Sequence, residues 1–225
     1  MDPGFRRDDE GRDLGMDLGI EHYGVFLTAG ILLNLAPGPD TFYILARSGA
    51  EGRAVGVAST LGIAAGSIVH TMAAAFGLSV LLATSPLAFD VVRYAGAAYL
   101  VFLGVRMLIA RASAIGDADT RGRGARAAFR QGMVTNVLNP KVALFFLAFL
   151  PQFIAPAAAH AKLGFVALGL SFVATGLCWC LALALAGAAI GAWLRARPRF
   201  GAWLDRICGA VFVGLGLRLA LQQRA

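Results

Sequence analysis

Six long apolar stretches occupy most of this 225-residue sequence and restrict the folds open to it. A helix needs about 20 mostly apolar residues to cross the hydrocarbon core of a bilayer, and these stretches reach or approach that length. Hydrophobic residues make up 58% of the chain and charged residues 15%, unlike the composition of soluble domains. The sequence therefore predicts an all-α integral membrane protein with six transmembrane helices. The expected spans are residues 23–46, 55–84, 87–110, 133–154, 163–194 and 200–221.

Arginine is concentrated in the first, third and fifth connections between these spans, at residues 47–53, 111–130 and 195–199. Basic residues favour the cytoplasmic side of a membrane, so this face is predicted to be cytoplasmic and both termini to lie outside. The formal net charge of +7 could also indicate nucleic-acid binding. Because the arginines lie in gaps between apolar runs, we expect them to bind lipid headgroups and no nucleic acid.

The longest connection divides the chain into two sets of three spans. We expect a polar N-terminal extension at residues 1–22, a first three-helix repeat at 23–110, an Arg-rich cytoplasmic loop at 111–130 and a second three-helix repeat at 131–225. The beginning of the extension lacks the apolar core of a signal peptide. Met16 begins an equally natural start, and we predict that translation begins there.

The first span of each set carries a similar motif. Residues 30–40 read GILLNLAPGPD and residues 132–141 read GMVTNVLNPK, so each copy has GxxxN followed by proline and a charged residue. Because each set has an odd number of spans, the second copy enters the membrane from the opposite side. This pattern is typical of inverted-topology repeats, whose broken helices place a substrate site near the bilayer midplane. The sequence thus predicts two inverted three-helix repeats.

Prolines interrupt both copies of the motif. A proline has no N–H group and clashes with the carbonyl four residues earlier, so backbone carbonyls lose their helical partners. In hydrocarbon these groups must find other partners, which can be side chains, water or a ligand. A restarted helix also presents N–H groups with positive dipole character. The residues predicted to break the two helices are Pro37, Gly38, Pro39 and Pro140.

Charged and amide side chains accompany the two breaks. Asp40 and Lys141 would each cost about 2.5 to 3.5 kcal/mol at the bilayer centre, so each is expected to face a partner or a wet cavity. Two other interpretations stay open: both charges anchor helix ends near the interface, or they pair permanently with each other. Asn34, Asn136 and Asn139 are predicted to line the same site and to supply hydrogen bonds.

Other polar and small residues give weaker signals. His70 lies in the second span and is a candidate proton relay, although a buried histidine more often has a hydrogen-bonded packing role. Gly62 and Gly66 form a GxxxG pair, which favours close helix packing and is compatible with a homodimer. The three cysteines lie within apolar segments, and no cluster of His, Cys and Asp predicts a metal site or a cofactor.

Longer matches extend the motif in both halves of the chain. They are NLAPGPDTFYILARS at residues 34–48, RYAGAAYLVFLGVRML at 93–108 and AFRQGMVTNVLNPKVALFFLAFLPQFI at 128–154. These segments resemble the LysE/RhtB family of bacterial amino-acid exporters. The resemblance implies a multi-pass protein of the bacterial inner membrane that expels amino acids or their analogues using the proton gradient. The signature residues that it implies here are Pro37, Gly38, Pro39, Asp40, Asn139, Pro140 and Lys141.

The combined interpretation is a secondary active exporter of amino acids that works by alternating access and proton antiport. Lys141 and a restarted helix N-terminus would bind the substrate carboxylate. Asp40 would bind the ammonium group and exchange it for a proton, since a carboxyl group in a low dielectric holds a proton more firmly than in water. The alternative is an exporter or channel for metal ions or small cations. No nucleophile and base are spaced as in an enzyme site, so no catalytic role is predicted.

Overall fold

The computed structural model describes residues 18–80, 86–109, 124–155, 158–186 and 198–221. Within these ranges the chain is helical, apart from turns and one isolated bridge between Ile20 and Ile154. In chain order the helices are α1 (Tyr23–Leu35), α2 (Pro39–Glu51), α3 (Arg53–Ala73), η1 (Ala74–Leu78), α5 (Pro86–Ile109), α6 (Ala125–Val137), α7 (Pro140–Leu144), η2 (Phe145–Phe149), η3 (Leu150–Phe153), α8 (Ala161–Leu185) and α10 (Pro198–Leu221).

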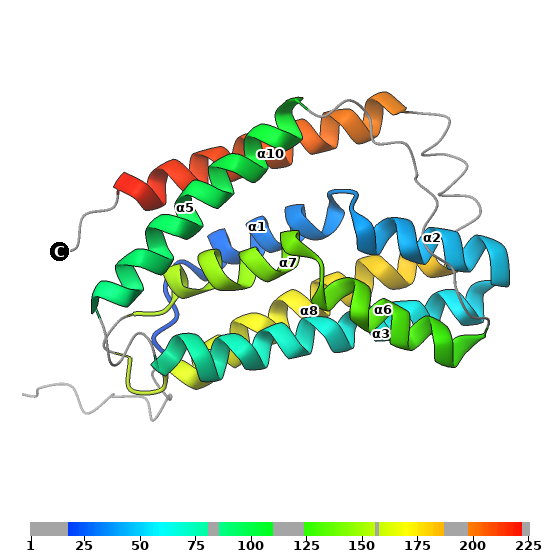
Figure 1. Cartoon of the computed structure of the whole chain (residues 1–225), viewed down its shortest axis with the longest axis horizontal. Coiled ribbons are helices and arrows are strands. Elements are labelled where there is room, and N and C mark those ends of the chain that lie inside the picture. The colour runs from blue at the N-terminus through cyan, green and yellow to red at the C-terminus, as the bar shows by residue number, and fades with distance from the viewer. Residues whose placement is uncertain (1–17, 81–85, 110–123, 156–157, 187–197, 222–225) are drawn as a thin grey trace, which may run out of the picture.

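The helices lie side by side in an elongated bundle (Figure 1). α5 and α10 cross on one side of it and run in opposite directions, while α3 and α8 lie on the other side. The two remaining pairs are broken helices: α1 continues into α2, α6 continues into α7, and the two pairs run in opposite directions. The described chain begins and ends at the same end of the bundle, on the left in Figure 1.

Among the described residues, two uninterrupted helical segments, Arg53–Leu78 and Ala161–Leu185, are long and apolar enough to cross a membrane. A third span passes the same test when Ala125–Val137 and Pro140–Phe153 are taken together. Shorter apolar helices of 10–17 residues fall in the other three expected spans. These findings support an all-α membrane protein, and the count of six spans stays a prediction. The shorter helices are Tyr23–Leu35, Tyr94–Ile109 and Arg206–Leu217.

Glycines bring α3 and α6 into direct backbone contact. A Cβ atom at Gly62 would collide with the carbonyl oxygen of Phe129, and one at Gly132 would lie 2.6 Å from a backbone oxygen of α3. Gly66 lies against Asn136, whose side chain a Cβ atom would approach to 2.8 Å. The predicted GxxxG pair therefore packs within the chain, and it holds Asn136 against α3.

Helix α6 begins at Ala125, so residues 125–130 of the loop expected at 111–130 are helical. The sequence predicts a loop here because Arg126 and Arg130 indicate a membrane boundary. A helix can continue past that boundary into water, where arginine is well solvated. Residues 111–123 of the loop lie outside the described ranges.

The segment before α1 is part of the fold. The Glu21 N–H donates to the carbonyl of Phe153 (2.9 Å), and the Ala155 N–H donates to the carbonyl of Gly19 (2.8 Å). The end of the expected extension 1–22 therefore pairs with the last residue of η3 and with the chain that follows it. Residues 1–17, with the predicted start at Met16, lie outside the described ranges.

Aromatic rings fill the bundle between the two helix breaks and the end where the described chain begins. The centroids of contacting rings lie 4.7 to 6.5 Å apart, and each residue is nearly fully buried. Such ring pairs add to the stability gained by burying apolar area. We call this group the phenylalanine cluster, and its members are Phe26, Phe145, Phe146, Phe149, Phe153 and Phe172.

Gly132→Ala should destabilise the protein, because the new methyl group forces α3 and α6 apart. Overpacking of this kind costs about 1 to 3 kcal/mol. We expect a lower Tm for the detergent-solubilised protein, measured by the loss of helical circular dichroism. Gly49→Ala is the matched control, since a Cβ atom there meets nothing within 4 Å and alanine favours the helix. Equal destabilisation by both substitutions would contradict the packing argument.

Candidate functional site

Two helix breaks face each other inside the bundle. α1 ends at Leu35 and α2 begins at Pro39. α6 ends at Val137 and α7 begins at Pro140, with a bend of 47° across the break. Both restarted helices have proline at their first position, where the missing N–H group has no helical acceptor to lose. The breaks therefore follow from the placement of the prolines.

Asp40 lies in the first turn of α2 and reaches the second break. Its Oδ2 atom accepts a hydrogen bond from Asn136 Nδ2 (2.8 Å), and the Oδ1 atom of Asn136 accepts one from Ser67 Oγ (3.2 Å). The Oδ1 atom of Asp40 is buried and has no hydrogen-bond partner among the described residues. Burying a carboxylate oxygen without a donor is costly. This atom is therefore suited to accept a hydrogen bond from a cation or to carry a proton.

Lys141 connects the second break to the first. Its Nζ atom donates to the carbonyl of Ala36, at the end of α1, over 2.7 Å. The ammonium group lies beside Gly38, where a Cβ atom would be 3.6 Å from Nζ. The Lys141 N–H donates to Oδ1 of Asn139 (3.1 Å), so Asn139 is the N-cap of α7. A cation at the C-terminal end of a helix is also favoured by the helix dipole.

His70 supports the second break from α3. Pro140 leaves the carbonyl of Asn136 without its usual helical partner. This carbonyl accepts from the Asn139 N–H (3.0 Å) and lies 3.2 Å from Nε2 of His70. Donation to a carbonyl requires the proton on Nε2. The His70 ring also stacks on Phe146, with centroids 5.6 Å apart.

Asn34 fastens the first break to α8. Its Nδ2 atom donates to Oγ1 of Thr175 (3.2 Å) and, more weakly, to the carbonyl of Phe172 (3.5 Å). Gly176 gives the amide room, because a Cβ atom there would lie only 3.1 Å from Asn34 Oδ1. Asn34 thus holds the end of α1 in place through α8, whereas the side chain of Asn136 is held by α2 and α3.

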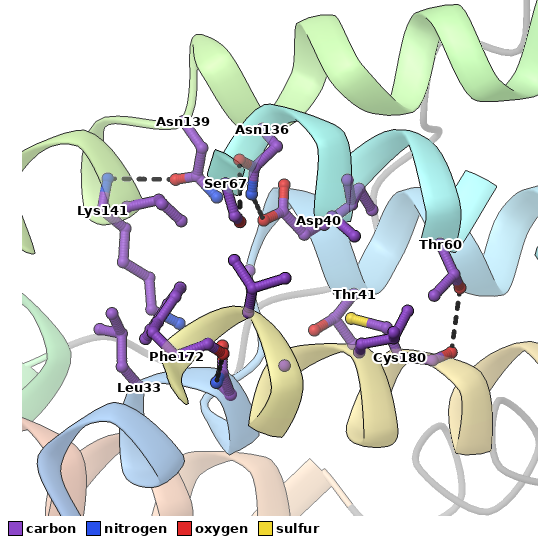
Figure 2. Close-up of a pocket in the computed structure, with 18 of the residues that line it drawn as sticks. Leu33, Asp40, Thr41, Thr60, Ser67, Asn136, Asn139, Lys141, Phe172 and Cys180 are labelled. Carbon is purple, nitrogen blue, oxygen red and sulfur yellow. Dashed lines mark hydrogen bonds between the residues drawn. The ribbon is translucent and has the colours of Figure 1, made fainter. Parts of the chain in front are cut away.

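A small cavity of about 40 Å³ lies between the two breaks (Figure 2). This volume admits a few water molecules but not an amino acid. Asp40, Asn136 and Asn139 lie on one side of the cavity and α8 lies on the other, and the side chain of Lys141 runs from α7 toward Phe172. Neither His70 nor the three helix-breaking prolines are among its lining residues. The predicted site residues that line it are Asn34, Gly38, Asp40, Asn136, Asn139 and Lys141.

Sequence reasoning missed the cavity residues of α3. Thr60, Ala64 and Ser67 line the cavity, and they follow the i, i+4, i+7 spacing of one helix face. Ser67 also donates to Asn136, and Thr60 Oγ1 donates to the carbonyl of Cys180 (3.2 Å). The sequence signal that could have identified this helix face is the pair Thr60 and Ser67, two polar residues seven positions apart in an apolar helix.

A second polar cluster lies at the Arg-rich end of the bundle. Arg47 is fully buried on α2 and forms an ion pair with Glu51, one turn later (2.6 Å). Both side chains hold Gly124: Arg47 Nη2 donates to its carbonyl (3.3 Å), and Glu51 Oε2 accepts from its N–H (2.8 Å). Gly124 has a φ of 84°, which favours glycine. We call these three residues the α2–α6 clamp.

The fold and the site together define a class of protein. Long apolar helices, two proline breaks and charged groups around an internal cavity are features of membrane transporters. In the part of the chain that the structure describes, no three His, Cys, Asp or Glu residues group as a metal site. The profile of the LysE type translocator family matches residues 31–223. The chain belongs to this family, which confirms the resemblance seen in the sequence.

Several curated proteins are similar to this chain over almost its whole length. A leucine efflux protein of Klebsiella pneumoniae is 32% identical over 208 residues, which cover 92% of this chain and 98% of the relative. A leucine efflux protein of Salmonella typhimurium is 30% identical with the same coverage. An uncharacterized membrane protein of Pseudomonas aeruginosa is 32% identical over 90% of this chain and 96% of its own length. No solved structure matches the chain.

Asn139→Ala should weaken α7, because it removes the acceptor for the Lys141 N–H. The loss of an N-cap costs about 0.5 to 2 kcal/mol. Asn139→Ser is the matched control, since serine also caps helices. We expect the alanine variant to have the lower Tm of the two in detergent. The same Tm for both would show that the cap does not stabilise α7.

Proposed function

We propose that this chain is a secondary active exporter of amino acids in the bacterial inner membrane, a multi-pass protein that works by alternating access and proton antiport. The observation that carries the proposal is the pair Asp40 and Lys141, which belong to two proline-broken helices and line one cavity. A carboxylate and an ammonium group match the two charges of an amino-acid zwitterion. The leucine efflux proteins among the relatives favour uncharged aliphatic amino acids as substrates.

The contacts at the breaks support one orientation of the substrate. Its carboxylate would replace the carbonyl of Ala36 as the partner of Lys141 and would meet N–H groups at the start of α2. Its ammonium group would donate to the buried Oδ1 of Asp40. Gly38 has no side chain to cover Lys141 from this side. Each contact thus replaces an existing partner or satisfies an acceptor that has none among the described residues.

Asp40 is also the proposed proton-coupling group. A buried carboxyl group is less costly when it is protonated or paired with a cation than when it is a bare carboxylate. A proton and the substrate ammonium therefore compete for the same group, and the release of one favours the binding of the other. His70 is the proposed relay for the proton. Asn136 separates it from Asp40 and contacts the two groups through different atoms, so a water molecule would have to carry the proton between them.

The opposite courses of α1–α2 and α6–α7 support two inverted repeats at residues 23–110 and 131–225 (Figure 1). In this pairing α3 corresponds to α8 and α5 to α10. The two ends of the bundle are closed in different ways, by the α2–α6 clamp and by the phenylalanine cluster. Because the cavity is smaller than an amino acid, this conformation would lie between the inward-open and outward-open states. The positive-inside rule places the clamp at the cytoplasmic end and both termini outside.

Efflux from proteoliposomes loaded with leucine tests the proposed transport. We expect wild-type efflux to be faster when the outside is more acidic than the lumen. Asp40→Asn and Lys141→Ala should each slow it by about a hundredfold or more, because each leaves one charge of the bound substrate buried without a partner, which costs about 3 to 5 kcal/mol. Lys162→Ala is the matched control, since Lys162 is exposed at the start of α8.

Two results would overturn parts of this proposal. If no amino acid moves under any pH gradient, the transport function is wrong. If Asp40→Asn or Lys141→Ala transports at the wild-type rate, that residue has no role in the mechanism.

The α2–α6 clamp can be tested through Cys180, which lines the cavity and is 9% exposed. In a Cys178→Ala, Cys208→Ala background, Glu51→Ala should speed the labelling of Cys180 by a charged maleimide. Inside-out membrane vesicles present the Arg-rich end to the reagent in the proposed orientation. Arg130→Ala, an exposed change on α6, is the control. An unchanged labelling rate in the Glu51 variant would show that the clamp does not close this end.

A further inference from the structure

The cavity has a chemically uniform side that the proposed binding of the two substrate charges does not use. α8 supplies this side, opposite Asp40, Asn136 and Asn139 (Figure 2). Its cavity-lining residues are Phe172, Val173, Gly176, Leu177 and Cys180, which share one face of the helix. None of them carries a formal charge. We call these residues the α8 face.

We propose that Val173 and Leu177 on the α8 face determine which amino-acid side chain the site accepts, and that this side chain is uncharged and aliphatic. The inference rests on the proposed transport function and on the position of its charged groups. With the carboxylate at Lys141, whose nitrogen lies near Phe172, and the ammonium group at Asp40, the rest of the substrate lies beside the part of the α8 face that follows Phe172 (Figure 2). The side chain of the substrate then points toward α8.

The charges around the cavity exclude substrates with a charged side chain. Asp40 and Lys141 are the only residues with a formal charge among those that line it in the described chain. The two charged groups on the α-carbon of any amino acid would occupy both of them. A third charge would then be buried against an apolar face without a partner, which is strongly unfavourable.

Three members of the α8 face have other roles. Phe172 packs on Phe145 with ring centroids 4.9 Å apart and belongs to the phenylalanine cluster. Gly176 accommodates Asn34, and the carbonyl of Cys180 accepts from Thr60. Val173 and Leu177 are the two members of the α8 face for which these contacts give no other role, and both are half-buried.

The geometry of α8 suits Val173 and Leu177 to a role in selectivity. They lie one helical turn apart on an uninterrupted helix of 25 residues, so α8 holds them at a fixed spacing. Changing either side chain alters the space on the apolar side and leaves the charged groups in place. An apolar pocket discriminates one methylene group by about 10- to 200-fold, so a single substitution should produce a measurable change.

Competition efflux tests this inference, with leucine, alanine and phenylalanine loaded together into proteoliposomes. Leu177→Ala should raise the rate of phenylalanine relative to leucine by about tenfold or more, because it enlarges the apolar side. Val173→Phe should lower leucine relative to alanine by a similar factor, because it fills that side. Leu170→Ala is the matched control, since Leu170 lies on the same helix, is 49% exposed and does not line the cavity.

The outcomes separate the two proposals. If the wild-type protein moves leucine and both variants keep its selectivity ratios, the role of the α8 face is wrong and the transport function stands. If the wild-type protein moves no amino acid, the transport function itself is wrong. If Val173→Phe or Leu177→Ala prevents folding, the smaller changes Val173→Ala and Leu177→Val serve in the same assay. Wild-type ratios in both of these would likewise overturn the inference.

Discussion

Backbone carbonyls that lose their helical partners inside a membrane must find other donors, and this requirement organises the centre of the structure. At the first break, Lys141 donates to the carbonyl of Ala36. At the second, His70 approaches the carbonyl of Asn136, whose side chain also holds Asp40. Each of these donors comes from outside the broken helix that it serves. Each break is therefore held by neighbouring helices, and a movement at one changes the partners of the other.

This mutual support explains how charged groups can stay inside an apolar bundle, and it is compatible with their proposed action on a substrate. Lys141 already has a carbonyl partner, so the exchange of that carbonyl for a substrate carboxylate leaves its charge paired throughout. Asp40 has one oxygen held by Asn136 and another that is buried without a donor among the described residues. The hydrogen bond from Asn136 to one oxygen fixes the orientation of the carboxylate. The other oxygen is thereby positioned to accept a proton or a hydrogen bond from the substrate in the proposed mechanism. In the proposed mechanism, the substrate ammonium group or a proton would neutralise Asp40 while Lys141 keeps a partner.

The sequence predicted the helical membrane class and the positions of the two breaks, because proline acts on its own helix and hydropathy is a local property. It did not predict the contacts that define the site. Asn34 meets Thr175, and Arg47 holds Gly124, through packing between segments far apart in the chain. Arg47 and Glu51 look like ordinary boundary charges, and only the tertiary structure shows that Arg47 is fully buried. Arg126 and Arg130 predict a loop where the structure has a helix for a related reason, since charge indicates where the membrane ends but not where a helix ends.

The two closures of the cavity differ in chemistry, and this difference bears on the direction of transport. The α2–α6 clamp consists of an ion pair and two hydrogen bonds to one glycine, and water can replace each of these contacts when the clamp opens. The phenylalanine cluster is held by apolar area, which water cannot satisfy. Opening toward the clamp should therefore cost less than opening toward the cluster. In the proposed orientation the resting protein would more readily admit substrate from the cytoplasm, and opening outward would depend on the free energy of substrate and proton binding.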